Sequence, residues 1–108
     1  MSHSFGEIVL LRFPFTDGRG FKQRPAVVLK DAQDGDLLVA RVTSRLRSEP
    51  YEVLIQDWQA AGLLQPSQIR IHKIASLEIS LVVRNLGTLS ASDLAELRRV
   101  TEEFWTSL

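Results

Sequence analysis

The segment Arg24–Thr43, RPAVVLKDAQDGDLLVARVT, carries two runs of aliphatic residues on either side of a turn signal. The aspartates and glycine at 34–36 are typical of a turn, so the runs at 24–29 and 37–43 are predicted to be β-strands. Pro25 has no backbone N–H to donate, so it should occupy the first residues of its strand or lie on an edge. The nearly continuous apolar stretch of the second run predicts burial on both faces for part of its length.

Four more strand patterns flank this segment. Short apolar runs bounded by proline, glycine or polar clusters predict strands at 7–13, 51–55, 68–74 and 80–87. Residues 57–62 have the pattern of one helical turn that stops at a glycine.

The run at 68–74 alternates between polar and apolar residues, as a strand with one wet face does. The apolar set is expected to face inward and consists of Ile69, Ile71 and Ile74. The polar set is expected to share the other, solvated face and consists of Gln68, Arg70 and His72.

The last segment has helical periodicity. Ser90 stands three residues before Asp93, as in a capping box. Apolar residues then recur at helical spacing, at Leu94, Leu97, Val100 and Phe104. Six short strands and one amphipathic helix predict a mainly β (α+β) fold, a small curled barrel or sandwich whose open side the helix covers. Without a linker or repeat, residues 1–108 are expected to form a single domain.

The composition argues against several classes of site. The chain has no cysteine and only two histidines, His3 and His72, so disulfides, thiolate zinc sites, iron–sulfur clusters and a cysteine nucleophile are excluded. Neither a metal site nor another cofactor is expected. No apolar run approaches the roughly 20 residues that span a bilayer, and the first residues lack a signal-peptide pattern. We therefore expect a cytoplasmic protein with no membrane partner.

Charge is distributed unevenly, although the formal net charge is zero. Residues 12–47 hold eight basic and four acidic side chains, whereas residues 48–108 hold five basic and eight acidic ones. A basic half is typical of a surface that meets phosphates, but so mild an excess also fits an ordinary solvated face. The glycine-rich loop at 17–22 adds two cations, Arg19 and Lys22, without the spacing of a P-loop.

Arginines and hydroxyls gather at the predicted strand ends. Arg24 precedes Pro25, residues 43–45 read Thr-Ser-Arg, and Arg70 shares a strand face with His72. The arginine side chain suits phosphate because its fork of donors is planar and always charged. RNA carries its own nucleophile, the 2′-hydroxyl, so its cleavage needs only proton transfer, in-line placement and charge stabilisation. The same residues also fit ordinary surface salt bridges and strand-end hydroxyls.

Several segments, taken in order, resemble one family. They are Gly6-Glu7-Ile8-Val9, Phe13-Pro14-Phe15-Thr16, Arg24-Pro25-Ala26-Val27-Val28-Leu29, Val42-Thr43-Ser44, Asp57-Trp58, Ala61-Gly62-Leu63, Pro66-Ser67, Arg70 with Lys73 and Ile74, and Leu86-Gly87-Thr88-Leu89-Ser90. Their order and spacing resemble the PemK/MazF-like family, the toxins of type II toxin–antitoxin modules, over nearly the whole chain. The resemblance implies an SH3-like β-barrel of the PemK/MazF/CcdB type with a C-terminal α-helix, assembled as a homodimer.

The resemblance also implies an activity and a partner. The activity is metal-independent, sequence-preferring cleavage of single-stranded RNA to 2′,3′-cyclic phosphate and 5′-hydroxyl ends. The partner is a cognate antitoxin whose disordered tail folds onto the toxin. Two alternatives share the fold: a CcdB-like inhibitor of DNA gyrase, and an inactive homologue that only binds its antitoxin or represses its operon.

Family roles carry over to individual residues. Arg24 and Thr43 match the catalytic pair, in which the arginine stabilises the phosphorane and moves a proton and the threonine holds a phosphate oxygen. Ser44 is expected to share the task of Thr43. Arg70 matches a further arginine of some members, but His72 stands where those members have an acid. The histidine therefore either supplies acid–base chemistry or is not catalytic.

Contacts with the RNA are expected from further cations and aromatic residues. The loop at 17–22 lacks the longer, glutamate-containing hairpin of the family. The cations expected to contact the RNA backbone are Arg19, Lys22, Arg45 and Lys73. Phe21 and Trp58 are candidates for stacking on bases, although Trp58 is also expected to be a core or interface residue.

Overall fold

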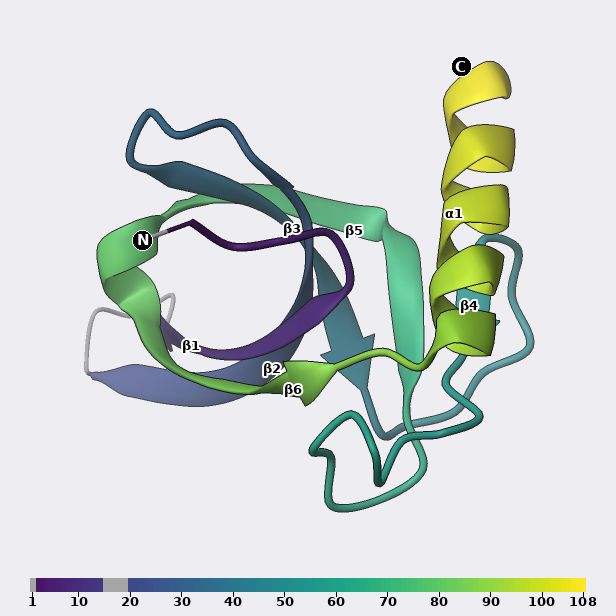
Figure 1. Ribbon diagram of the computed structural model, residues 1–108, viewed down its shortest axis with the longest axis horizontal. Helices are drawn as coiled ribbons and strands as arrows, with labels where there is room; N and C mark the ends of the chain where they lie inside the picture. The colour runs from purple at the N-terminus through teal and green to yellow at the C-terminus, as the bar shows by residue number, and fades with distance from the viewer. Residues whose placement is uncertain (1, 15–19) are drawn as a thin grey trace.

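The computed structural model describes residues 2–14 and 20–108, and there it shows six β-strands followed by one α-helix (Figure 1). The strands are β1 (Glu7–Pro14), β2 (Phe21–Asp31), β3 (Asp36–Thr43), β4 (Glu52–Leu54), β5 (Gln68–Glu78) and β6 (Val82–Thr88). A 3-10 turn at Ile79–Leu81 joins the last two strands, and α1 spans Ala91–Thr106. Every predicted element except the turn of helix at 57–62 is present, with β4 shorter and β2 and β5 longer than their patterns.

The strands form one antiparallel sheet in the order β4-β5-β3-β2-β1-β6. The sheet curls strongly, so that in Figure 1 β1, β2, β3 and β5 surround a common interior while α1 stands beside β4 and β5. This arrangement confirms the mainly β (α+β) class with a C-terminal helix. The sheet is not a closed barrel, because no pairing within the described residues joins its two edge strands, β4 and β6.

Both faces of the curled sheet bury apolar side chains. Ile8 belongs to an outer core between the sheet and α1, together with Leu97 of the helix, whereas its neighbour Val9 belongs to an inner core inside the curl. Neighbouring side chains on a strand point to opposite faces, so one strand can serve both cores. The two-sided burial predicted for β3 is confirmed, since Val39 lies in the inner core and Val42 in the outer one.

Helix α1 begins at its predicted cap. The hydroxyl of Ser90 accepts the backbone N–H of Asp93. The carboxylate of Asp93 is 2% exposed and accepts the backbone N–H groups of Gln56 (3.0 Å) and Asp57 (2.8 Å). Asp93 thereby joins the first turn of α1 to the connection between β4 and β5, where its negative charge also suits the helix N-terminus. No helix in the described ranges is both long and apolar enough to cross a membrane.

The prediction that three polar residues of β5 face solvent is wrong for two of them. Gln68 and Arg70 are only 3% and 9% exposed, and only His72 is exposed. Strand β4 and the chain that leads into it cover them, with Glu52 of β4 and Glu49 of that chain against Arg70. Alternation identifies the two faces of a strand, but it does not show which segment later packs over the polar face.

The helical turn predicted at 57–62 is a hydrogen-bonded turn in the structure. The N–H of Ala61 donates to the carbonyl of Asp57 at 3.2 Å, and that of Gly62 donates to the carbonyl of Gln59 at 3.0 Å. The structure assigns no helix here. Gly62 ends the turn as predicted, with a φ of +85° that favours glycine.

Candidate active site

Strands β2 and β3 separate at one end of the sheet. Their ladder ends at Ala26 and Arg41, while β2 extends back to Phe21 along β1 and β3 extends to Thr43 along β5. Pro25 is the first β2 residue beyond the ladder, and it lacks the N–H that a further bond to β3 would need. The prediction that Pro25 lies in the first residues of its strand or on an edge is wrong, because it is the fifth residue of β2, between β1 and β3. Proline is accommodated there because β3 has already separated from β2.

A cleft of about 370 Å³ lies where the two strands separate. Arg24 lines it from β2, and Thr43 and Ser44 line it from the end of β3. The β4–β5 connection forms one wall and β6 contributes to the other side. The full lining is Leu10, Gln23, Arg24, Pro25, Val42, Thr43, Ser44, Gly62, Leu63, Leu64, Gln65, Ser67, Arg84 and Leu86. Three of the five predicted catalytic residues thus share one cleft.

The cleft carries positive charge without a compensating acid. Its described lining includes Arg24 and Arg84 and contains no Asp or Glu. Within the described part of the chain, neither arginine has an ion-pair or hydrogen-bond partner. Guanidinium groups match phosphate oxygens in geometry and charge, so the cleft suits an anionic ligand. Across residues 2–14 and 20–108, no three His, Cys, Asp or Glu side chains are grouped so as to hold a metal ion.

The Thr43 side chain is oriented by a local turn. Its Oγ1 accepts the backbone N–H of Arg45 at 3.1 Å. A hydroxyl that accepts a hydrogen bond still has its own O–H to donate. Thr43 can therefore donate to an oxygen atom of a ligand in the cleft, and Ser44 beside it brings a second hydroxyl.

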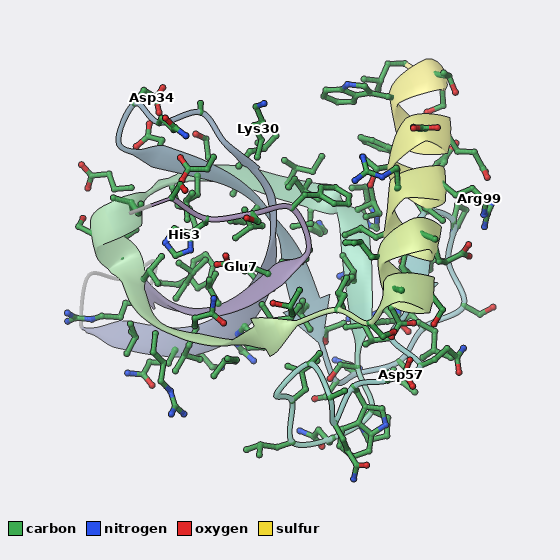
Figure 2. The ribbon with its side chains drawn as sticks, in the orientation of Figure 1. His3, Glu7, Lys30, Asp34, Asp57 and Arg99 are labelled. Atoms are coloured by element: carbon green, nitrogen blue, oxygen red, sulfur yellow. The ribbon has the colours of Figure 1, made fainter. Side chains whose placement is uncertain are left out.

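The cleft wall formed by the β4–β5 connection is held tightly. It begins next to Asp57, which Figure 2 shows beside the first turn of α1. Further along, a Cβ placed on Gly62 would lie 2.0 Å from the carbonyl oxygen of Leu86 in β6. A Cβ on Gly87 of the same strand would lie 2.6 Å from the carbonyl oxygen of Ala61. Two glycines therefore let the backbones of the wall and of β6 touch, which only residues without a side chain permit.

Arg70 is not part of the cleft lining and is engaged by acids. Its guanidinium forms ion pairs with Glu49 (Nη2 to Oε2, 3.1 Å) and Glu52 (Nε to Oε2, 3.5 Å). The side-chain amide of Gln68 donates to Glu52, and its Oε1 accepts the backbone N–H of Arg47 at 3.0 Å. This network pins the chain before β4 onto β5. Because two carboxylates already balance its charge, the arrangement favours a structural role for Arg70.

His72 lies beside Arg70 rather than beside Arg24. Its Nε2 is 3.2 Å from Nη2 of Arg70, and since arginine can only donate, the imidazole nitrogen accepts. His72 is exposed and is not among the residues that line the cleft. The five predicted catalytic residues therefore fall into two groups on neighbouring parts of the sheet.

The residues predicted to contact RNA are placed as follows. Three of the cations are exposed, namely Lys22, Arg45 and Lys73. Arg19 and the side chain of Phe21 lie outside the described residues. Trp58 is partly buried against the outer core, in line with the expectation of a core residue.

Sequence reasoning missed Arg84. The sequence offered one signal for it. Arg84 stands two residues before Leu86, and residues two apart on a strand share a face, so both can line the cleft. Nothing in the local pattern shows that β6 pairs with β1, and only that pairing brings this face to the cleft.

Comparisons with known proteins bear on this site. A family model described as the PemK-like, MazF-like toxin of type II toxin–antitoxin systems matches residues 4–104. The structure is similar to a crystal structure of MazE–MazF from Deinococcus radiodurans, with a TM-score of 0.77 and 26% identity over 98% of each chain. The Mycobacterium tuberculosis toxin MazF-mt6 shares the fold at 20% identity, with a TM-score of 0.71 over 91% of this chain and 96% of that one.

A third similar structure is an endoribonuclease in complex with its cognate antitoxin from a Mycobacterial species. It is 13% identical and has a TM-score of 0.76 over 97% of this chain and 96% of that one. No curated protein matches the chain significantly.

Proposed function

Because this chain belongs to the PemK-like, MazF-like toxins of type II toxin–antitoxin systems, we propose that it is a metal-independent, sequence-preferring endoribonuclease. It cleaves single-stranded RNA and leaves 2′,3′-cyclic phosphate and 5′-hydroxyl ends. The observation that carries the proposal is the cleft in which Arg24 and Thr43 stand on the two strands that separate at Pro25. An arginine without a partner in the described structure and a hydroxyl donor, lining the same cleft, are groups that bind a phosphodiester.

In this reaction the RNA supplies its own nucleophile. The 2′-hydroxyl loses its proton to water and bonds to the adjacent phosphorus, and the bond from phosphorus to the 5′ oxygen breaks as that oxygen takes up a proton from water. Negative charge on the non-bridging oxygens rises in the transition state. Arg24 and the Thr43 hydroxyl donate hydrogen bonds to those oxygens, which is the type of electrostatic stabilisation that lowers such barriers most. Ser44 supplies a further donor.

The wall of the cleft suits the bases on either side of the scissile phosphate. Leu63 and Leu64 lie there beside the amide of Gln65. Leu64 is 95% exposed, an unusual state for a leucine that lines a charged cleft. Proteins bind unstacked bases of single-stranded RNA through contacts to their faces and hydrogen bonds to their edges. The leucines of this wall supply apolar contact, and the Gln65 amide supplies hydrogen-bonding groups.

The proposal includes a protein partner and an assembly. The Deinococcus structure is a MazE–MazF complex, and the Mycobacterial one pairs an endoribonuclease with its cognate antitoxin. By analogy, this toxin is a cytoplasmic homodimer that is inhibited by an antitoxin whose disordered tail folds over the cleft.

The test compares wild type with Arg24→Ala and Lys30→Ala on long single-stranded RNA in excess chelator, with the ends mapped by sequencing. Lys30, labelled in Figure 2, is an exposed cation at the opposite end of β2 from Arg24, so its removal changes the net charge equally. We expect wild type and Lys30→Ala to cut at recurrent sequences and leave 5′-hydroxyl ends. Arg24→Ala should not cut, and its circular dichroism should be unchanged because Arg24 has no partner to lose in the described structure.

Two results would contradict the proposal. Cleavage by Arg24→Ala would refute the assigned site. Absence of cleavage by folded wild type would refute the nuclease, and a DNA supercoiling assay would then separate a gyrase inhibitor from a protein that only binds its antitoxin.

A further inference from the structure

Arg84 is linked to Pro25, the neighbour of Arg24, by a row of residues across three strands. On β6 it pairs with Leu10 of β1, and Leu10 pairs on its other side with Pro25 of β2. Directly opposed residues on antiparallel strands share a face. A strand spacing of about 4.8 Å therefore places Arg84 and Pro25 about 10 Å apart on one face. Arg84 and Arg24 line the same cleft from its two sides.

The charge of Arg84 is not balanced by the protein. Two arginines are paired with acids, Arg70 with Glu49 and Glu52, and Arg99 with two glutamates of α1. Arg84 is exposed and has no such partner within the described ranges. Two like charges at one cleft repel each other weakly across water, so this arrangement does not stabilise the fold. A ligand with more than one negative group would balance both charges of the cleft.

We propose that Arg84 binds a phosphate of the RNA next to the scissile one, while Arg24 acts on the scissile phosphate itself. This inference deepens the proposed nuclease function and rests on it. The RNA backbone then runs across the strands, along the row from Pro25 through Leu10 to Arg84, with its bases toward the wall that carries Leu64. Arg84 is a substrate-binding residue, because the apolar floor at Leu10 separates it from the reacting atoms.

The first experiment measures binding without cleavage. The ligand is an RNA oligonucleotide that contains a mapped cleavage site with a 2′-O-methyl group in place of the nucleophile. Dissociation constants are measured at several salt concentrations for wild type, Arg84→Ala, Arg84→Lys and Lys30→Ala. We expect Arg84→Ala to bind about tenfold more weakly and to lower the slope of log affinity against log salt by about 0.7, the change for one lost phosphate contact with a single strand.

The two other variants serve as controls. Arg84→Lys keeps the positive charge, so it should retain most of the salt slope while losing the forked hydrogen bonds. Lys30→Ala removes an equal charge away from the cleft and should match wild type. A purely structural role of Arg84 would lower the melting temperature without changing the salt slope, so thermal melts of all four proteins are recorded.

The second experiment separates binding from chemistry on cleavable RNA. Arg84→Ala should raise KM about tenfold with kcat within about threefold of wild type, because it removes binding that substrate and transition state share. If Arg84→Ala has the same KM and salt slope as wild type, the inference is wrong, but the proposed nuclease function is unaffected. If wild type never cleaves, the same long single-stranded RNA is the ligand, and binding that depends on Arg84 would support the inference and refute the nuclease. A wild type that neither binds nor cleaves RNA would refute both.

Discussion

The carboxylate of Asp93, in the first turn of α1, accepts the backbone N–H of Asp57 at 2.8 Å, although the two residues are 36 positions apart in the chain. The same carboxylate accepts the N–H of Gln56 at 3.0 Å. One buried side chain therefore ties the C-terminal helix to the start of the segment that walls the cleft. The geometry of the cleft depends on the helix through this contact.

Replacing Asp93 should lower stability strongly. Asp93→Ala removes two charge-assisted hydrogen bonds and leaves two backbone N–H groups without acceptors, so the free energy of unfolding should fall by about 2–4 kcal/mol. Asp93→Asn retains one acceptor oxygen and should lose less. Urea unfolding followed by circular dichroism measures both. Wild-type stability in Asp93→Ala would show that the contact does not hold the wall.

The glycine contact between the wall and β6 predicts a second large effect. Gly62→Ala places a Cβ against the carbonyl of Leu86 and also strains a φ of +85°, so it should cost about 3 kcal/mol or more. Gly35 has a similar φ of +98°, but a Cβ there meets nothing within 4 Å. Gly35→Ala should therefore cost only about 1 kcal/mol, from the backbone alone. Equal losses in the two variants would argue against close packing at Gly62.

The ion pairs of Arg70 predict that its loss affects folding more than catalysis. Arg70→Ala leaves the Glu52 side chain, 4% exposed, as a buried charge without its cation, and this should cost about 3–5 kcal/mol. The double variant with Glu52→Gln should recover part of the loss, because it removes that charge. Cleavage per folded molecule should change little in the double variant. A stable double variant without cleavage would restore Arg70 to the catalytic set.

The position of His72 predicts a small effect. His72 is exposed and is not part of the cleft lining, so His72→Asn should change stability by no more than about 0.5 kcal/mol. The cleavage rates of wild type and His72→Asn should have the same pH profile between about pH 5.5 and pH 8. This is the range in which a catalytic histidine titrates. Loss of one limb of the profile in the variant would identify His72 as an acid or base of the reaction.

A pH effect is expected at the N-terminal end of the chain. Backbone N–H groups of His3 and Gln33, each 2.8 Å from the carboxylate of Asp31, lower the pKa of Asp31 below its ordinary value. His3, which Figure 2 shows near Glu7, also contacts that glutamate. The pKa of Asp31 is therefore lower in the folded state than in the unfolded chain. At pH values between these two pKa values the unfolded state binds more protons, so stability rises with pH across that range.

The stabilising effect of Asp31 is thus complete above the ordinary pKa of an aspartate and is lost as pH falls through the lowered one. Asp31→Asn should melt below wild type at neutral pH, and the difference should shrink in acid. Thermal melts of both proteins between about pH 7 and pH 2.5 measure it. A difference that stays constant across this range would show that the Asp31 charge does not contribute.

Elements that depend on neighbouring residues were predictable from the sequence. The turn at Asp34–Asp36, the helix cap at Ser90 and the six strands follow from local backbone chemistry and from the period of apolar residues. The family pattern also placed Arg24 and Thr43 near strand ends that the structure brings to one cleft. Pro25 shows why this part was predictable, because a residue without an N–H cannot donate a ladder hydrogen bond, and the β2–β3 ladder ends beside it.

Contacts between residues far apart in the chain were decided only by the tertiary structure. The sequence by itself determined the strands, the helix and the family, and it singled out Arg24 and Thr43 as candidate site residues. The pairing of β6 with β1 decided that Arg84 faces the cleft, and the cover over β5 decided that Arg70 is paired and buried. The backbone N–H of Asp93 is part of the predicted cap, whereas its carboxylate holds the start of the cleft wall. The physical reason is that local patterns record which face of an element a side chain occupies, whereas its partner depends on which distant segment packs against that face.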